Sequence, residues 1–326
     1  MKYNYVVFGS NDPYYLLGYD ELNNHSDSIY FGEPFQNNFL LKMLRKTHMT
    51  PRINRYIKMP FKSLWNRNLF KNCFDNDNPI CFLFFSAGPF ADHIPYGFVE
   101  YLKEEFPQSK YVVFYQDLVD ATKRTVSLDE YRRKMDLIVS FDYNDCDKYQ
   151  MIYHPLVYSD IREKITEYKE KSDIYFCGAE KNRLGTILEA YNVFQDLGFK
   201  CDFTVITNNY KLLNDYSGGI HFCRSFSYHE NLQHIKSCKA MIEIMQKGGS
   251  GYTIRALECI AFNKKLITNN SYINRATFYD NNNFMYYEKM TDSDIYSKFI
   301  NSEATSYKYI KAILPHRFLE FIDCHL

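Results

Sequence analysis

The chain lacks a net charge and any long apolar run. Its 326 residues include 39 Lys and Arg against 39 Asp and Glu, so no basic excess is present to neutralise nucleic-acid phosphates. No stretch approaches the roughly 18 apolar residues that a membrane-spanning helix needs. The N-terminus also lacks the charged and apolar regions of a signal peptide. We therefore expect a cytoplasmic protein that binds no nucleic acid.

Paired cysteines and metal-ligand spacings are also missing. The nine cysteines are scattered, form no CxxC pair and are odd in number, which does not suit a disulfide framework. Cys81 stands inside an apolar run and is typical of a buried, reduced thiol. His229 and His234 are five positions apart, not the four that would place two ligands on one helix face. We expect neither disulfides nor a bound metal ion.

What the chain does have is a regular alternation of apolar runs and amphipathic segments. Runs bounded by Gly, Pro or Asp are typical of strands buried on both faces of a parallel sheet. The strands predicted in this way are 5–8, 80–85, 111–115, 137–141, 174–177, 203–206, 220–222, 240–245 and 266–268. The helices predicted between them are 96–106, 184–197, 230–237 and 252–262. Strand and helix in alternation predict an α/β fold.

The pattern occurs twice, on either side of a charged segment at 159–172 that we predict to be a helix-like surface linker. We expect two Rossmann-like domains facing a central cleft, an N-terminal one over 1–160 and a C-terminal one over 161–305. A helical tail over 306–326 follows. Parallel sheets bind ligands at the carboxyl ends of their strands, so the residues after each strand are the candidates for function.

The stretch from Gln246 to Glu258 carries the strongest local signal for a ligand. It follows a predicted strand and opens a predicted helix, and its glycines let a ligand approach the backbone closely. Free N–H groups at a helix start favour an anion. The candidate ligand-binding residues are Gly249, Ser250, Gly251, Tyr252, Thr253, Arg255 and Glu258. A plain strand–helix turn capped by Ser250 or Thr253 is the alternative.

A second element ends the first strand of the C-terminal domain. Gly178 is followed by two cations, Lys181 and Arg183, a combination that suits a diphosphate. A solvated loop that caps the next helix is the alternative.

At these motifs the chain resembles the GT-B glycosyltransferases, especially the bacterial enzymes that build lipopolysaccharide and capsular polysaccharide. The resemblance covers roughly residues 80–290. The stretches that carry it are Tyr175–Gly178 with Lys181 and Arg183, Tyr228–Leu232, Ser250–Glu258, Lys264–Asn270, and Met135–Asp142 with His154-Pro155.

The resemblance implies an enzyme, a hexosyltransferase, that moves a sugar from a nucleotide-diphosphate sugar to a hydroxyl of a growing surface glycan. It implies no further cofactor, donor binding in the C-terminal domain and acceptor binding in the N-terminal one. Many of these enzymes carry two glutamates, of which the second contacts the ribose; Glu258 matches it, and Tyr228 is a candidate to stack on the base. The first glutamate falls on Ser250, a departure that leaves the donor sugar and the stereochemistry open.

An inverting mechanism also needs a base for the acceptor hydroxyl. We rank Asp92 and His93 first, because they follow a strand in a long loop with Gly and Pro; Asp12 and Asp117 are the other candidates. Each of these residues could instead be a turn or capping residue. The acidic stretch 142–147 resembles a metal-binding DxD motif but is better explained as a strand end and a helix start.

The zero net charge hides one uneven window. Residues 34–74 contain no Asp or Glu, and apolar side chains including Trp65 are interleaved with the cations. The cations are Lys42, Arg45, Lys46, Arg52, Arg55, Lys58, Lys62, Arg67 and Lys71. We predict that Arg55, Lys58, Lys62 and Trp65 contact an anionic membrane or glycolipid acceptor, placing the enzyme on the inner face of the cell membrane. A solvated helix face is the alternative.

Two other functions stay open. A degenerate transferase would bind a sugar nucleotide without turning it over, and the Ser250 departure keeps that alternative open. A sugar-nucleotide epimerase of the same architecture would need carboxylates flanking the sugar instead of an acceptor site.

Overall fold

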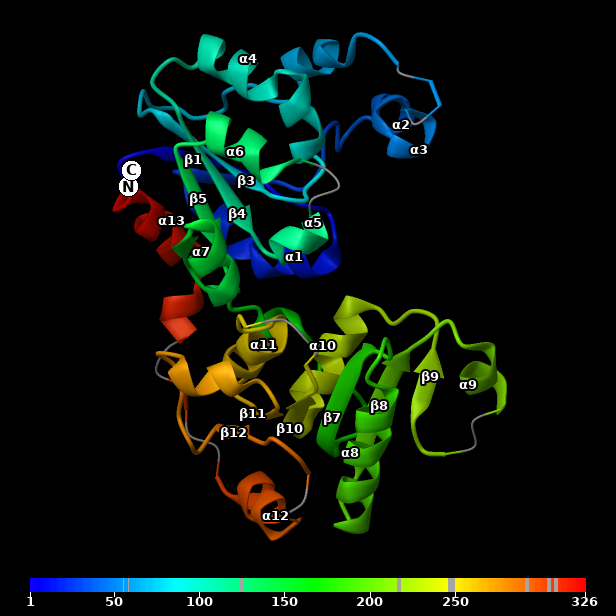
Figure 1. The fold of residues 1–326 in the computed structure, drawn as a ribbon. Coiled ribbons are helices and arrows are strands. Elements are labelled where there is room, and N and C mark those ends of the chain that lie inside the picture. Colours follow the sequence, from blue (N-terminus) through cyan, green and yellow to red (C-terminus); the bar gives the residue numbers. More distant parts are fainter. Residues whose placement is uncertain are drawn as a thin grey trace. The chain divides into compact units, whose positions relative to one another are not determined.

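The computed structural model divides the chain into two compact units (Figure 1). It describes residues 1–54, 56–57, 59–122, 126–215, 218–245, 250–290, 293–303, 306–307 and 310–326. Unit 1 contains Met1–Ser159 together with Leu314–Leu326, and unit 2 contains Asp160–Ile313.

Unit 1 is built on a six-stranded sheet in the order β2-β1-β3-β4-β5-β6, in which every neighbouring pair is parallel. The strands are β1 (Asn4–Phe8), β2 (Ser28–Phe31), β3 (Ile80–Phe85), β4 (Lys110–Tyr115), β5 (Leu137–Ser140) and β6 (Ile152–Tyr153). The chain adds strands on one side of the sheet from β1 to β2 and on the other side from β3 to β6. The topological switch point therefore lies between the carboxyl ends of β1 and β3.

Helices cover both faces of this sheet. One face packs against η3 (Ala91–Tyr96), α4 (Phe98–Glu105) and α6 (Leu128–Lys134), and the other against η1 (Asp20–Asn24) and the C-terminal helix α13 (Pro315–Asp323). The remaining helices are α1 (Pro13–Gly18), α2 (Phe39–Met49), α3 (Pro51–Asn54), η2 (Lys62–Asn68), α5 (Val119–Thr122) and α7 (Tyr143–Tyr149). Burial on both faces explains why β1, β3 and β4 are near-continuous apolar runs.

Unit 2 is a second parallel six-stranded sheet, ordered β12-β11-β10-β7-β8-β9. The strands are β7 (Ser172–Ala179), β8 (Cys201–Ile206), β9 (His221–Cys223), β10 (Cys238–Glu243), β11 (Lys265–Thr268) and β12 (Phe284–Tyr286). Read from β9, the order is that of the dinucleotide-binding Rossmann fold. Its switch point therefore lies between β7 and β10.

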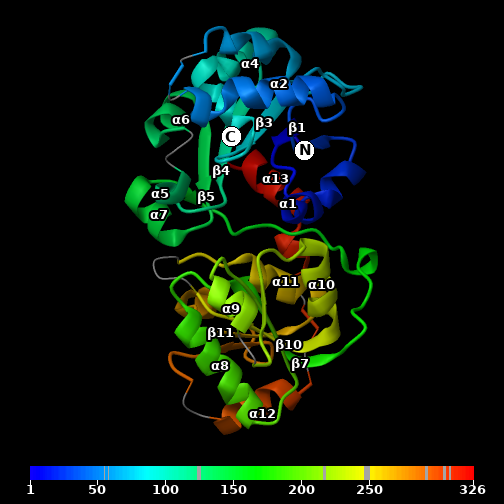
Figure 2. The same cartoon turned by 90° about the vertical axis from the view of Figure 1, so that its right-hand side faces the viewer.

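Two helices pack on each face of the second sheet (Figure 2). The helices α8 (Leu184–Asp196) and α12 (Ser293–Asn301) form one apolar core with it, and α10 (Tyr228–Ser237) and α11 (Ile254–Phe262) lie on the opposite face. The other helices are η4 (Arg162–Lys164), α9 (Tyr210–Asp215), η5 (Ser271–Arg275) and η6 (Ile310–Ile313). α8 stops where the sequence predicts, since Gly198 takes φ +78° just beyond it.

The structure confirms the α/β class with two Rossmann-like sheets. The linker prediction is wrong in its conformation: within 159–172 the structure has the short turn η4, and Ile161 and Ile165 are buried, so the segment is anchored to the unit rather than free. The nine cysteines are unpaired, and the four buried ones are Cys81, Cys146, Cys238 and Cys259. Asp142 caps α7 by accepting from the backbone N–H of Asp145, as its helix-start interpretation requires.

Candidate functional site

The candidate site lies at the switch point of unit 2, where the carboxyl ends of β7 and β10 are neighbours. The Arg183 guanidinium joins the two ends: its Nε donates to the carbonyl of Ala179 at 3.0 Å, and its Nη1 donates to the carbonyl of Ile244. A cation is therefore held at the position where this fold binds the phosphates of a nucleotide.

Gly178 is required by this arrangement. A Cβ built on Gly178 would lie 2.7 Å from Nη2 of Arg183, so any larger residue would displace the guanidinium. Arg183 also lies over the Phe176 ring, with 5.7 Å from its central carbon to the ring centroid. Burial, and then the neighbouring Arg255, lower the pKa of Arg183 from its ordinary high value, which marks a place where positive charge is concentrated.

The start of α11 faces the same switch point, because α11 follows β10. Thr253 is its N-cap, and its hydroxyl accepts from the backbone N–H of Arg255 at 3.1 Å. The same hydroxyl donates to Glu243, the last residue of β10, which also accepts from Thr268 at the end of β11. Burial raises the pKa of Glu243, although both hydrogen bonds oppose the rise. These contacts fix the helix start against the sheet.

Glu258 is the centre of a buried polar cluster. It is fully buried and forms an ion pair with Arg255, whose side chain is 21 % exposed. The Tyr228 hydroxyl donates to its Oε1 at 2.8 Å, and Asn231 Nδ2 lies 3.4 Å from the same oxygen. Burial raises the pKa of Glu258, with Arg255 and the hydrogen bonds working in the opposite direction. The cluster ties α10 to α11.

The other residues that the sequence predicts to bind the donor lie in different surroundings. Ser250 is fully buried, and Tyr252 is buried with its ring edge-on to Phe278 at 5.1 Å, so the Tyr252 ring is part of the packing. Lys181 is exposed and takes φ +40° in the turn after β7. Gly249 lies outside the described residues.

Three residues at this site have no role in the sequence prediction. Glu243 is the last residue of β10, and Asn231 accepts from the Tyr175 hydroxyl at 3.0 Å while also facing Arg255. Glu180, just after β7, has a buried Oε2 with no hydrogen-bond partner among the described residues. The position of Glu180 at a strand end was a usable signal, whereas the other two depend on contacts between distant segments.

In unit 1 the structure argues against His93 as a base. His93 is fully buried, and its Nε2 lies 3.0 Å from Nη1 of Arg45. An arginine can only donate, so Nε2 is the acceptor and the proton is on Nδ1. Burial, followed by the charge of Arg45, lowers the pKa of His93 to about 3. Its neighbour Asp92 is half-buried, and burial raises the pKa of that carboxyl.

The other two base candidates lie at the switch point of the first sheet. Asp12 and Asp117 are both exposed and line a cavity of about 130 Å³ at the carboxyl ends of β1, β3 and β4. Ser10 donates to the Asp12 carboxylate at 3.0 Å. This edge of unit 1, rather than the buried His93, offers carboxylates to an incoming hydroxyl.

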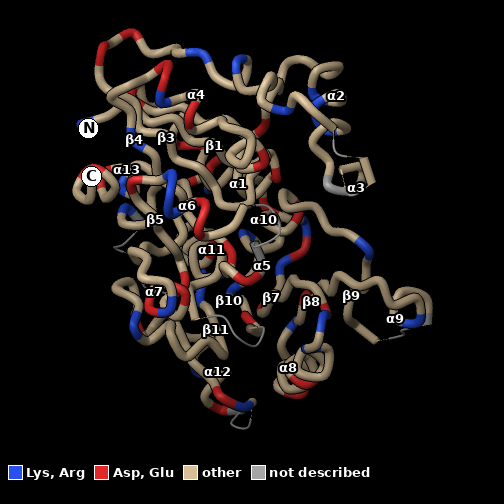
Figure 3. Tube along the Cα trace, turned by 45° about the horizontal axis from the view of Figure 1, so that its top comes forward, with Lys and Arg blue, Asp and Glu red and all other residues tan. Residues whose placement is uncertain are grey.

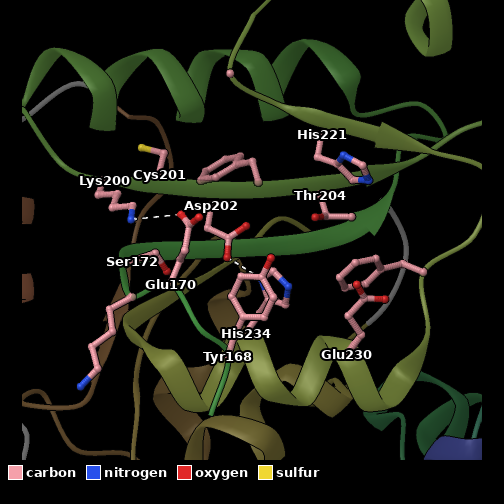
Figure 4. Close-up of a pocket in the computed structure, with 14 residues that line it drawn as sticks. Tyr168, Glu170, Ser172, Lys200, Cys201, Asp202, Thr204, His221, Glu230 and His234 are labelled. Atoms are coloured by element: carbon pink, nitrogen blue, oxygen red, sulfur yellow. Dashed lines mark hydrogen bonds and ion pairs between the residues drawn. The ribbon is translucent and has the colours of Figure 1, made fainter.

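A different cavity, of about 310 Å³, lies beside α10 (Figure 4). His234 contacts Asp202 there, with Nδ1 and Oδ2 2.6 Å apart, and the Tyr168 ring stacks on the imidazole at 3.8 Å. Asp202 is the second residue of β8, so this cavity is nearer the amino ends of the strands than the carboxyl ends. It is distinct from the switch-point site.

The basic window forms an unusual surface in unit 1. Along α2 the apolar side chains Phe39, Leu40, Met43 and Leu44 are exposed, with Phe39 79 % exposed. Figure 3 shows Lys and Arg but no Asp or Glu along α2. No helix among the described residues is long and apolar enough to cross the membrane.

The structure describes two of the four residues that are predicted to form this surface. Lys62 is buried and donates to the Tyr96 hydroxyl at 2.9 Å, so its charge is used inside the unit and the prediction of a surface contact is wrong. Trp65 donates to Nδ1 of His48 at 2.8 Å and lines an apolar groove with Phe61 and Leu64. Arg55 and Lys58 lie outside the described residues.

Solved structures that are similar to this chain include glycosyltransferases. A UDP-forming α,α-trehalose-phosphate synthase from Burkholderia xenovorans matches with a TM-score of 0.51 at 10 % identity, over 98 % of this chain and 95 % of that one. The α,α-trehalose 6-phosphate synthase from Burkholderia multivorans gives 0.50 at 8 %, over 99 % and 96 %. AviGT4, a glycosyltransferase of avilamycin A biosynthesis, gives 0.50 at 10 %, over 76 % and 84 %. The chain has the GT-B fold.

No protein-family model and no curated sequence matches the chain. The GT-B fold is thus established by structure at identities of 10 % or less, a level at which the chemistry has to be argued from the residues themselves.

Proposed function

We propose that the protein is a glycosyltransferase that takes its sugar from a nucleotide-diphosphate sugar bound at the β7–β10 switch point of unit 2. The observation that carries the proposal is Arg183, which is fixed to the carboxyl ends of both strands beside the start of α11. In a Rossmann fold this is the phosphate position.

Transfer of a glycosyl group breaks the bond between the sugar and the diphosphate, so negative charge grows on the departing phosphate. A positive charge that is already in place stabilises that charge without reorganising during the reaction. Arg183 supplies a cation, and the N-terminus of α11 adds the positive end of the helix dipole. Both are held by contacts to the sheet instead of by the ligand.

In this proposal Glu258 holds Arg255 in place near the phosphate position. Their ion pair fixes the Arg255 side chain in the first turn of α11, so Glu258 acts as a positioning residue for the cation. A contact between Glu258 and the ribose, which the resemblance implies, requires Tyr228 or Arg255 to give up its hydrogen bond to the carboxylate.

The acceptor hydroxyl is assigned to unit 1. A general base must approach the hydroxyl to within hydrogen-bond distance, and Asp12 and Asp117 are the exposed carboxylates at the carboxyl edge of that sheet. Asp92 stays a weaker candidate because it is half-buried beside Arg45.

The acceptor surface in this proposal is an anionic membrane face that carries a lipid-linked glycan. The supporting observation is that α2 turns Phe39, Met43 and Leu44 outward while Arg45 and Met49 are buried. Solvent-facing apolar stripes flanked by cations are typical of helices that lie in a membrane interface. Lys46, Arg67 and Lys71 are the exposed cations that the structure describes in the basic window.

Thermal unfolding with a panel of sugar nucleotides and free nucleoside diphosphates tests the donor assignment. A ligand that binds the folded state raises the unfolding temperature. We expect one nucleotide class to do so in the wild type and to do so much less in Arg183→Ala, because loss of a charge-assisted contact costs about 1.5–3 kcal/mol, roughly 10- to 100-fold in affinity. Equal shifts in both proteins would refute the site.

A further inference from the structure

Two histidines from opposite ends of the chain meet in unit 1. His25 follows η1, and His316 is in the first turn of α13; their rings lie 4.1 Å apart between centroids, 22° from parallel. Asp27, just before β2, joins them, and ligand atoms of the three residues all lie within 4.8 Å of one another. All three side chains are half-buried.

Polar atoms in this cluster are inaccessible to solvent and have no hydrogen-bond partner within the described parts of the chain. They are Nδ1 of His316, Oδ1 of Asp27 and Oε2 of Glu21. Glu21 borders the cluster, with its Oε1 3.6 Å from Nε2 of His25. Buried polar atoms are nearly always paired, so three orphans at one place indicate a missing partner. A divalent cation can accept electron pairs from both carboxylates and from the imidazole nitrogen at once.

We propose that His25, Asp27 and His316 bind a divalent transition-metal ion, with Glu21 as a fourth ligand or as the group that orients His25. Imidazole nitrogen and carboxylate oxygen are the ligands that zinc takes in proteins, usually four in a tetrahedral arrangement. A hard ion such as Mg²⁺ prefers all-oxygen sites, so this ligand set favours zinc. Stacked rings direct their lone pairs in nearly parallel planes, so one imidazole must turn for both to bind one ion.

The site has a structural consequence. His316 belongs to α13, whose Phe318, Leu319 and Ile322 are buried in the core of unit 1. The Tyr5 hydroxyl of β1 bonds to the Leu319 carbonyl at 3.0 Å and to Asp323 at 2.6 Å. A metal bound by His25, Asp27 and His316 would fasten the first turn of this helix to the segment before β2.

Zinc titration of the full chain, stripped of metal with a chelator, tests the proposal. We expect one equivalent of Zn²⁺ to bind and to raise the unfolding temperature, and a chelator to reverse both effects. His25→Gln and His316→Gln should each weaken binding by at least about tenfold, since even an outer-sphere partner is worth about 10–100-fold. Asp27→Asn, nearly isosteric, gives a third variant if a histidine substitution impairs folding.

His325→Gln is the matched control, because His325 follows the same helix and lies outside the cluster. It should bind zinc as the wild type does. A wild type that binds no zinc would overturn the proposal, and so would binding that is equal in the wild type and in both histidine variants. None of these results depends on glycosyl transfer, so the proposed function is judged separately.

Discussion

Buried charged side chains decide the character of the site in unit 2. Glu243 and Glu258 are buried, Arg183 and Arg255 are half-buried, and every one has a partner that is also fixed by the fold. A buried charge is costly unless it is paired, so the four residues depend on one another. Changing one member should therefore affect folding as well as binding.

Glu258→Ala should lower the free energy of unfolding by about 2–3 kcal/mol, because it leaves Arg255 largely buried without its carboxylate partner. Breaking a fully buried ion pair usually costs about 3–5 kcal/mol, and the expected cost is smaller here because the Arg255 side chain is 21 % exposed. Glu258→Gln, which keeps the size and an oxygen acceptor, should cost less. Urea unfolding measures both. The exposed Glu189→Ala in α8 is the control, with an effect within about 0.5 kcal/mol. Equal losses in the control and Glu258→Ala would contradict the cluster.

His93 should make the protein sensitive to acid. The pKa of His93 is about 3 in the folded state, against an ordinary 6.5. Below pH 6.5 the unfolded state therefore binds more protons than the folded state, so the free energy of unfolding decreases as the pH is lowered. Between pH 7 and pH 5 the expected loss from His93 is about 2 kcal/mol. His154, whose pKa burial lowers to about 4, adds a similar loss.

Unfolding in urea at both pH values, on wild type and His93→Gln, measures this. The variant should lose about 2 kcal/mol less than the wild type over that interval. The exposed His229→Gln should follow the wild type. A variant as acid-sensitive as the wild type would show that His93 is not the group responsible.

At the residue scale, the sequence predicts positions next to strands better than it predicts contacts. Arg183 and Thr253 could be found because they lie in the segments between a predicted strand and the helix after it. The buried state of His93 could not, since it depends on Arg45 in another segment packing against it. The His25–Asp27–His316 cluster escaped a search for ligand spacing for the same reason: its members meet only after the chain folds.

At the scale of elements, α2 is the exception to the rule that a helix turns its apolar side inward. Its outward residues include Phe39 and Leu44, whereas its buried residues include Arg45. The neighbouring α4 follows the ordinary pattern and buries Phe98, Val99 and Leu102. An inverted helix is stable only where something else covers its apolar side or where function requires exposure.

The double substitution Phe39→Ser/Leu44→Ser should weaken binding to vesicles of phosphatidylcholine with anionic phosphatidylglycerol by at least about tenfold, because each apolar side chain contributes roughly 1.5–3 kcal/mol when buried. Lys46→Glu should also weaken binding, with a smaller effect at high salt. Sedimentation with vesicles measures both variants.

Tyr210→Ser is the matched control, since Tyr210 is 70 % exposed on α9 in unit 2. It should bind vesicles as the wild type does. If the wild type does not bind, or if the α2 variant binds equally well, α2 is not a membrane-docking helix.

Elements with strong patterns were predictable, and short ones were not. The predicted strands 80–85 and 203–206 correspond to β3 and β8, because burial on both faces leaves a continuous apolar run. The strands β2, β6 and β12 at the sheet edges were missed; they have two to four residues and mixed exposure. The helix-like charge pattern of 159–172 failed because charge spacing alone does not form a helix.

At the scale of the molecule, two parallel six-stranded sheets belong to one chain with no net charge. The sequence predicts both sheets because their central strands are long enough to show their burial. The strand orders, and with them the two switch points, come only from the structure. The resemblance predicts a glutamate at position 250, but this chain has Ser250 there, which supplies no carboxylate. The structure buries Ser250 completely.

The central claim is that the β7–β10 edge of unit 2 holds a nucleotide-diphosphate sugar for transfer. The measurement that tests it most directly is NMR of sugar nucleotides incubated with wild type and Arg183→Ala. The account predicts slow release of free sugar and nucleoside diphosphate from one donor class by the wild type, and a rate lower by about 10- to 100-fold in the variant. Formation of an epimer without nucleotide release, or binding without any turnover, would contradict it.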